Sequence, residues 1–204
     1  MVSILLSGLG LSILHAVIPN HWIPLVTISK KENWDLRKTL RITFFAGGAH
    51  VLSTIAIGLF ISLLSFHLSD NFSSYMSWIS SLLLIGLGIF FIYRHYHHHH
   101  FNIGTDYSGL SQAKKIQVIV LAMFFSPCLE IEALYLLAGQ DGWISVALLS
   151  ILYTTVTLTG MLAWVYLVYK GLEKLNQNWH KLEHYSGIIS GIILIATGLV
   201  VLFL

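Results

Sequence analysis

The sequence predicts an all-α, polytopic membrane protein with six transmembrane helices. Of its 204 residues, 56% are hydrophobic and only 10% are charged, whereas about 25% of the residues in a soluble domain carry charge. Six stretches are free of Lys, Arg, Asp and Glu over most or all of the roughly 20 residues that a transmembrane helix needs. They predict helices over residues 2–29, 42–67, 74–94, 116–139, 143–169 and 184–204.

The fourth predicted helix is unusual because it contains two acidic residues, Glu130 and Glu132. A carboxylate at the centre of a bilayer costs about 2.5–3.5 kcal/mol, so two of them so close together require a reason. Apart from Arg94 at the very end of the third, no Lys or Arg lies inside a predicted helix to balance their charge. A bound metal ion or a transported proton would balance it, which makes this helix the first place to look for function.

The basic residues predict the orientation of the helices. All eleven Lys and Arg residues lie in the first, third and fifth connections, within Lys30–Arg41, Arg94–Lys115 and Lys170–Lys181. The second and fourth connections carry only Asp70 and Asp141. Because basic connections stay on the cytoplasmic side, we expect a multi-pass protein of the cell (inner) membrane with both termini outside. Its surroundings would be the lipid bilayer, with no nucleic-acid partner, and a homo-oligomer is left open.

The chain contains an internal repeat. Residues Tyr75–Gly88 align without gaps on Tyr185–Gly198, and all three prolines lie in the first and fourth predicted helices. Three helices per repeat insert the two repeats in opposite orientations. We therefore expect inverted three-helix repeats over 1–94 and 116–204, joined by a cytoplasmic His-rich connection over 95–115, with helices one and four broken. Inverted repeats with matched broken helices are typical of transporters, and the breaks mark the binding site.

Polar side chains near the prolines form a candidate metal site. They are His15, Asn20, His21, His50, Cys128, Glu130 and Glu132. Imidazole and thiolate ligands favour nickel, cobalt, zinc and iron over calcium and magnesium. On a regular helix Cys128 and Glu132 share a face, because they are four residues apart, whereas Glu130 points nearly opposite. We expect Cys128 and Glu132 to meet the three histidines in one pocket near the midplane, with Asn20 and Glu130 at its edge.

Three motifs resemble a known family. His15-Ala-Val-Ile-Pro-Asn20-His21 resembles the His-x-x-x-x-Asp-His signature in the first helix of the nickel/cobalt transporters, the NiCoT and NicO groups of the lysine-exporter superfamily. Gly48-Ala-His50-Val-Leu-Ser53-Thr54 is similar to their second-helix motif, and Ser126-Pro127-Cys128 to the Pro-Cys motif of the NicO branch. Asn20 stands where the family has Asp. The resemblance implies that three residues bind metal: His15, His21 and His50.

These observations predict a secondary transporter for a divalent transition-metal ion of the nickel, cobalt, zinc, iron or manganese class. The metal would be cargo, and we expect no enzymatic activity, catalytic residue or cofactor. One alternative is a proton-coupled exporter of a small organic or sulfur-containing solute on the same fold. An intramembrane metalloenzyme is less favoured, because only three histidines, His15, His21 and His50, lie away from the ends of the predicted helices. The His95–His100 tract is either a metal buffer or sensor, or a polar loop that binds metal incidentally.

Overall fold

The protein is described by a computed structural model. It describes residues 1–17, 21–67, 70–97, 110–171, 188, 191–192, 194–200 and 202. The elements in these ranges are helices, and no strand occurs in them. The all-α class predicted from the sequence is therefore confirmed for this part of the chain.

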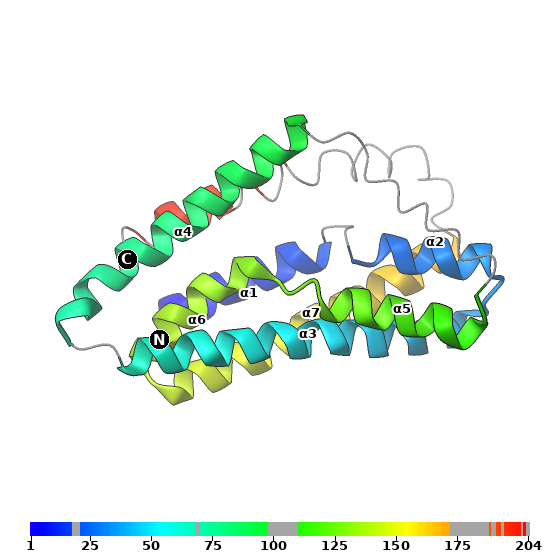
Figure 1. Cartoon of the computed structure of the whole chain (residues 1–204), viewed down its shortest axis with the longest axis horizontal. Coiled ribbons are helices and arrows are strands. Elements are labelled where there is room, and N and C mark those ends of the chain that lie inside the picture. The colour runs from blue at the N-terminus through cyan, green and yellow to red at the C-terminus, as the bar shows by residue number, and fades with distance from the viewer. Residues whose placement is uncertain are drawn as a thin grey trace.

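Two long helices, α3 (Leu36–His67) and α7 (Trp143–Lys170), form the body of the molecule, and four shorter helices pack along them. The other helices are α1 (Val2–Val17), α2 (Ile23–Lys31), α4 (Asp70–His97), α5 (Gln112–Phe124) and α6 (Leu129–Asp141). Figure 1 shows α3 and α7 running the length of one layer with α1, α2, α5 and α6. Helix α4 lies to one side of this layer, beside helical residues close to the C-terminus.

Helices α3 and α7 are long and apolar enough to cross a membrane, with 32 and 28 residues. Helices α5 and α6 together make a third candidate span, bent by 47° at the break between them. Helix α1 and residues 78–90 of α4 are apolar but shorter. Of the sixth predicted helix, over 184–204, about half of the residues lie outside the described part of the chain. The described residues therefore offer two to three candidate membrane spans, and the six-span arrangement stays a prediction.

Both proline-containing helices are broken. Helix α1 ends at Val17 and α2 begins at Ile23, so the predicted helix over 2–29 is interrupted beside Pro19, which itself lies outside the described residues. Helix α5 ends at Phe124 and α6 begins at Leu129, with Pro127 between them. Proline lacks the N–H that a helix interior needs, which accounts for the break at Pro127.

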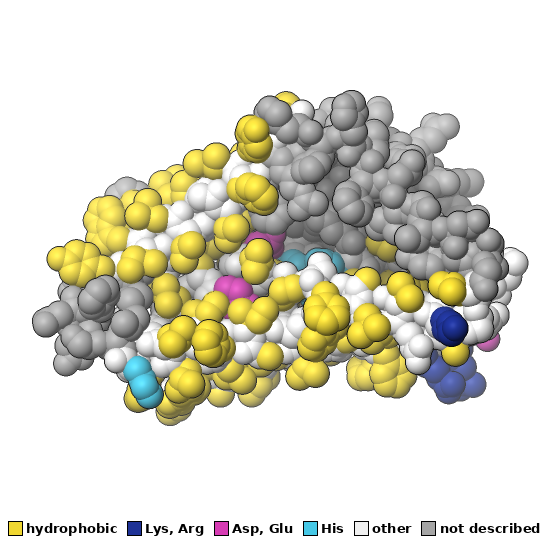
Figure 2. Space-filling view, in the orientation of Figure 1, with side chains coloured by type: hydrophobic (Ala, Val, Ile, Leu, Met, Phe, Trp, Pro, Cys, Tyr) yellow, Lys and Arg dark blue, Asp and Glu magenta, His cyan; other side chains and the backbone are white. Residues whose placement is uncertain are grey.

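The surface of the long helices is apolar. Phe45 and Phe60 on α3 are 65% and 62% exposed, and Ile151 on α7 is 64% exposed. Figure 2 shows hydrophobic side chains along this face of the helices, with Lys and Arg at the end where α2 lies. Soluble monomers rarely expose apolar patches larger than a few hundred Å². This surface suits helices whose sides face lipid.

Close contacts without intervening side chains hold α4 against the C-terminal helical residues. A Cβ atom added to Gly88 would stand 2.6 Å from the carbonyl oxygen of Gly191, and one added to Gly198 would stand 2.9 Å from that of Ser81. Position 88 thus meets 191, and position 81 meets 198. The two segments therefore run antiparallel.

Helix α6 is fixed to α3 by backbone contact and by two hydroxyl groups. A Cβ atom on Gly139 would stand 2.6 Å from the carbonyl oxygen of Ser62. The Ser62 hydroxyl donates to the carbonyl of Tyr135 at 2.8 Å, and the Ser65 hydroxyl donates to that of Leu136 at 2.7 Å. Small residues let membrane helices approach closely, and hydroxyls bond across the interface. This contact sets the position of α6, and with it the second helix break.

Replacing Gly139 with Ala is expected to lower the stability of the protein in detergent by about 1–3 kcal/mol, because the added methyl group overlaps backbone atoms of α3. Gly48→Ala is the matched control, since a Cβ there meets nothing within 4 Å. The control should leave the stability unchanged or raise it by up to about 1 kcal/mol, which is the difference in helix propensity between Gly and Ala. Thermal unfolding followed by circular dichroism measures both, and equal midpoints would contradict the close α3–α6 contact.

Candidate metal centre

The candidate site lies where the two broken helices meet the middle of α3. His15 occupies the last turn of α1, and His21 lies between α1 and α2. His50 projects from α3, and Cys128 is the residue on which α6 begins. His15, His50 and Cys128 are 6%, 0% and 5% exposed, so the site is enclosed by the helices. Two breaks in the chain thus bring ligands from both halves of the sequence together.

Three histidines form the first ligand group. The Nε2 atoms of His15 and His50 lie 3.2 Å apart, and their rings are stacked with centroids 5.3 Å apart. The ring of His21 lies 4.6 Å from that of His15 and 4.5 Å from that of His50, measured between centroids. One nitrogen of each residue falls within 4.8 Å of the others. The three residues can therefore present nitrogen ligands to one ion.

A second ligand group consists of His15, Cys128 and Glu130. His15 Nδ1 lies 3.4 Å from Cys128 Sγ and 3.5 Å from Glu130 Oε2, and the sulfur lies 3.8 Å from that oxygen. Ligands bound at about 2.0–2.3 Å to one tetrahedral ion stand roughly 3.3–3.7 Å apart. The three atoms are therefore spaced almost as they would be on one face of a zinc-like coordination sphere.

His15 belongs to both groups. Its Nε2 atom faces His50, and its Nδ1 atom faces Cys128 and Glu130. The two nitrogens lie on different sides of the imidazole ring, so each ligand group contains a different nitrogen of His15. His15 is thus the residue that joins the two ligand groups.

The two carboxylates lie differently from the arrangement that the sequence predicted. The sequence predicted Glu132 beside Cys128 and placed Glu130 at the edge, but Glu130 makes the contacts with Cys128 and His15. The prediction assumed that the helix continues through Cys128. Cys128 instead has an extended conformation, with φ −81° and ψ 95°, and the helix begins after it. The rule that residues four apart share a face does not apply across that boundary.

Glu132 is buried close to the start of α6 without a partner in the described part of the chain. It is 7% exposed, and neither of its carboxylate oxygens has a hydrogen-bond partner there. It belongs to neither ligand group. Asn20, also predicted at the site, lies outside the described residues. The His95–His100 tract starts in the last turn of α4 and continues beyond the described residues, so its role stays a prediction.

Two residues outside the predicted ligand set support the histidines. The Tyr153 hydroxyl on α7 lies 3.2 Å from His50 Nε2. The Thr54 hydroxyl on α3 accepts from the backbone N–H of Cys128 at 3.0 Å and donates to the carbonyl of His50 at 3.0 Å. Thr54 therefore ties the second helix break to the turn of α3 that carries His50. Nothing in the sequence distinguishes Tyr153 from the other aromatic residues of its apolar helix.

No family model, curated protein or solved structure matches the chain. The likeness of its motifs to nickel/cobalt transporters therefore stays a prediction from three short segments. A functional hypothesis depends on the ligand geometry and on the arrangement of the helices around it.

Thr54→Val is expected to destabilise the protein by about 1–3 kcal/mol, because it leaves the buried N–H of Cys128 without its acceptor. Thr154→Val is the matched control, since the Thr154 hydroxyl donates only to the carbonyl of Ser150 in its own helix. Thermal unfolding in detergent compares the two variants. Equal small losses would show that the Thr54–Cys128 hydrogen bond does not hold the break in place.

Proposed function

We propose that this chain is a secondary membrane transporter for a divalent transition-metal ion. The observation that carries the proposal is the pair of ligand groups sharing His15 at the meeting point of two broken helices. Transporters built from inverted repeats bind their cargo between such breaks. The polar residues here have no evident structural need to be buried among apolar helices, whereas a cation would give each of them a partner.

The ligand chemistry favours a soft or borderline metal. The two groups offer imidazole nitrogens, one sulfur and one carboxylate oxygen. Such sets suit zinc, cobalt and nickel, whereas calcium and magnesium prefer oxygen ligands. An ionised thiol and carboxylate would also neutralise the two positive charges of the ion. The spacing of the second group favours a tetrahedral ion, such as zinc or cobalt.

The packing of the helices supports an inverted repeat. The first broken helix packs on α7, through α1 and α2, and the second packs on α3, through α5 and α6. If α7 is the counterpart of α3 in the second repeat, a two-fold rotation exchanges these two sets of contacts. The contact between positions 88 and 191 likewise becomes the contact between 198 and 81 when Tyr75–Gly88 is exchanged with Tyr185–Gly198.

An ion pair shows how such a molecule would close one end. Lys115 in the first turn of α5 donates to both carboxylate oxygens of Glu32, at 2.7 and 2.8 Å, just after the end of α2. It joins the two broken helices at the end where the basic residues lie, which we propose faces the cytoplasm. Access to the ligands from that side would require these helix ends to separate, as alternating access demands.

The sequence motifs add independent support. The likeness of His15–His21, Gly48–Thr54 and Ser126–Cys128 to nickel/cobalt transporter motifs implies metal binding by the histidines. The first two of these segments supply the three-histidine group, and the third supplies Cys128. We propose that the ion occupies one group and then the other, with His15 as the common ligand, and that the protein is not an enzyme.

His15→Ala is expected to weaken metal binding more than any other single ligand change, because it removes a ligand from both groups. The loss should exceed the roughly 10–100-fold effect of an outer-shell change. His67→Ala is the matched control, since His67 lies exposed at the end of α3, outside both groups. Isothermal titration with Co²⁺ and Zn²⁺ gives the affinities.

All titrations use protein in which the histidines of His95–His100 are replaced by Gln, so that this tract does not bind metal incidentally. Proteoliposome flux of the same ions tests transport. If binding and flux survive the combined loss of His15 and His21, the metal proposal fails. The organic-solute exporter on the same fold would then be the better reading.

Glu130→Gln is expected to weaken metal binding by roughly tenfold or more, and Glu132→Gln is expected to weaken it less. The reason is that Glu130, and not Glu132, contacts Cys128 and His15. The two changes are chemically identical and two residues apart, so each serves as the control for the other. A larger effect of Glu132→Gln would mean that α6 begins before Cys128 when metal binds.

The proposed orientation has a direct test. Cysteines placed at Asp70 or Asp141, in a Cys128→Ser background, should react with an impermeant thiol reagent added outside the cell. Cysteines at Arg37 or Lys174 should react only after the membrane is permeabilised, because basic connections stay inside. Labelling of intact cells at Arg37 would reverse the orientation without affecting the metal proposal.

A further inference from the structure

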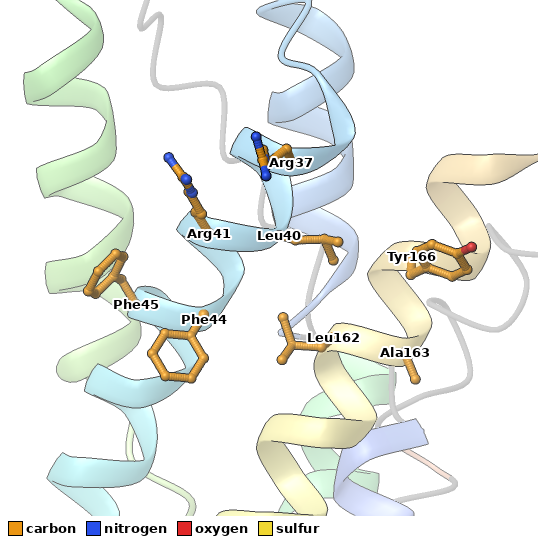
Figure 3. Close-up of a pocket in the computed structure, with 8 residues that line it drawn as sticks. All are labelled: Arg37, Leu40, Arg41, Phe44, Phe45, Leu162, Ala163 and Tyr166. Carbon is orange, nitrogen blue, oxygen red and sulfur yellow. The ribbon is translucent and has the colours of Figure 1, made fainter.

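An open groove lies between the first turns of α3 and the last turns of α7, apart from the metal centre. It has a volume of about 860 Å³. Arg37, Arg41, Phe44 and Phe45 line it from α3, and Leu162 and Tyr166 line it from α7. Figure 3 shows the two arginines at one end of the groove and the two phenylalanines below them. The groove lies between the two helices that can each cross a membrane.

The groove is cationic at one end and apolar along its depth. Arg37 and Arg41 are four residues apart, so their side chains lie on one side of α3. Lys170 adds a third positive charge near this end, with its ammonium 4.9 Å from the ring centroid of Tyr166. Phe44 and Phe45 follow one turn further along α3 and are 51% and 65% exposed. The groove therefore matches a molecule with an anionic head and an apolar tail.

The two guanidinium groups are available to an external anion. Neither Arg37 nor Arg41 forms an ion pair with a carboxylate among the described residues. Two neighbouring lysines, Lys38 on α3 and Lys115 on α5, are already engaged. Lys38 donates to Gln112 at 2.5 Å and lies over the ring of Trp34, and Lys115 pairs with Glu32. Two guanidinium groups without a carboxylate partner among the described residues thus stand at the mouth of the groove.

We propose that this groove binds one anionic phospholipid, with the phosphate between Arg37 and Arg41 and the acyl chains along the phenylalanines and Leu162. Basic pockets between transmembrane helices bind anionic headgroups, and the guanidinium fork matches phosphate geometry. From Arg37 to Phe45 a helix rises about 12 Å, which fits within the roughly 15 Å half-thickness of the hydrocarbon core. The proposal depends on α3 and α7 spanning the membrane and is independent of metal transport.

Native mass spectrometry of the delipidated protein tests this binding. Phosphatidylglycerol and phosphatidylcholine with identical acyl chains are added separately. We expect one phosphatidylglycerol to bind, with weaker retention of phosphatidylcholine and no displacement by inorganic phosphate. At about 1 kcal/mol for each basic residue, Arg37→Gln should weaken phosphatidylglycerol binding about fivefold, and the double change with Arg41→Gln about 30-fold. The combination of Lys31→Gln and Lys114→Gln removes two exposed charges elsewhere and should leave the affinity unchanged.

A second variant tests the groove itself without changing any charge. Ala163 also lines the groove, so Ala163→Trp should fill it and reduce phosphatidylglycerol retention. Ile151→Trp on the same helix is its control, because Ile151 is exposed and lies outside the groove. Equal retention of the two lipids by wild-type protein, or unchanged binding in both the double arginine variant and Ala163→Trp, would overturn the proposal. A dimer that Ala163→Trp dissociates would overturn it too, because a second copy would then occupy the groove.

Discussion

The hydrogen bonds of one threonine hydroxyl hold the centre of this molecule together. A break in a helix surrounded by apolar side chains frees backbone groups that must find partners inside the protein. Thr54 accepts from the N–H of Cys128 and donates to the carbonyl of His50, both at 3.0 Å. This one side chain thus gives the buried N–H of Cys128 a hydrogen-bond partner. It also fixes the second break against the turn of α3 that carries His50. His15 reaches both ligand groups because of this arrangement.

The sequence indicated the breaks and most of the residues that gather beside them, but not how these residues are paired. Proline removes a backbone donor wherever it occurs, so Pro19 and Pro127 predicted both interruptions. Glu130, and not Glu132, lies beside Cys128, and which of them does so depends on whether the helix includes Cys128. Helix boundaries are the part of a structure that residue patterns define least well. Tyr153 could be recognised only once α7 was placed against α3, since its contact is with a residue 103 positions away.

The start of α3 also differs from the prediction, because the length of an apolar stretch does not show where a helix begins. The charge-free stretch begins at residue 42, yet the helix begins at Leu36. Asp35 accepts a hydrogen bond from the backbone N–H of Lys38 at 2.8 Å, and Arg and Lys are good helix formers. A count of apolar residues identifies the part of a helix that can face lipid, whereas the capping residue marks the start of the helix. Arg37 and Arg41 consequently lie on a rigid helix, not on a loop.

The shared histidine has a consequence for stoichiometry under the proposed function. A neutral imidazole carries one lone pair and one N–H, so His15 can offer a ligand atom to only one of its two groups at a time. The two groups would therefore hold a single ion between them, not two. Movement of that ion from one group to the other would require a proton to move in the opposite sense, from one ring nitrogen to its neighbour. The position of the cargo and the tautomer of one side chain would then be linked, with another group releasing and accepting the proton as the tautomer changes.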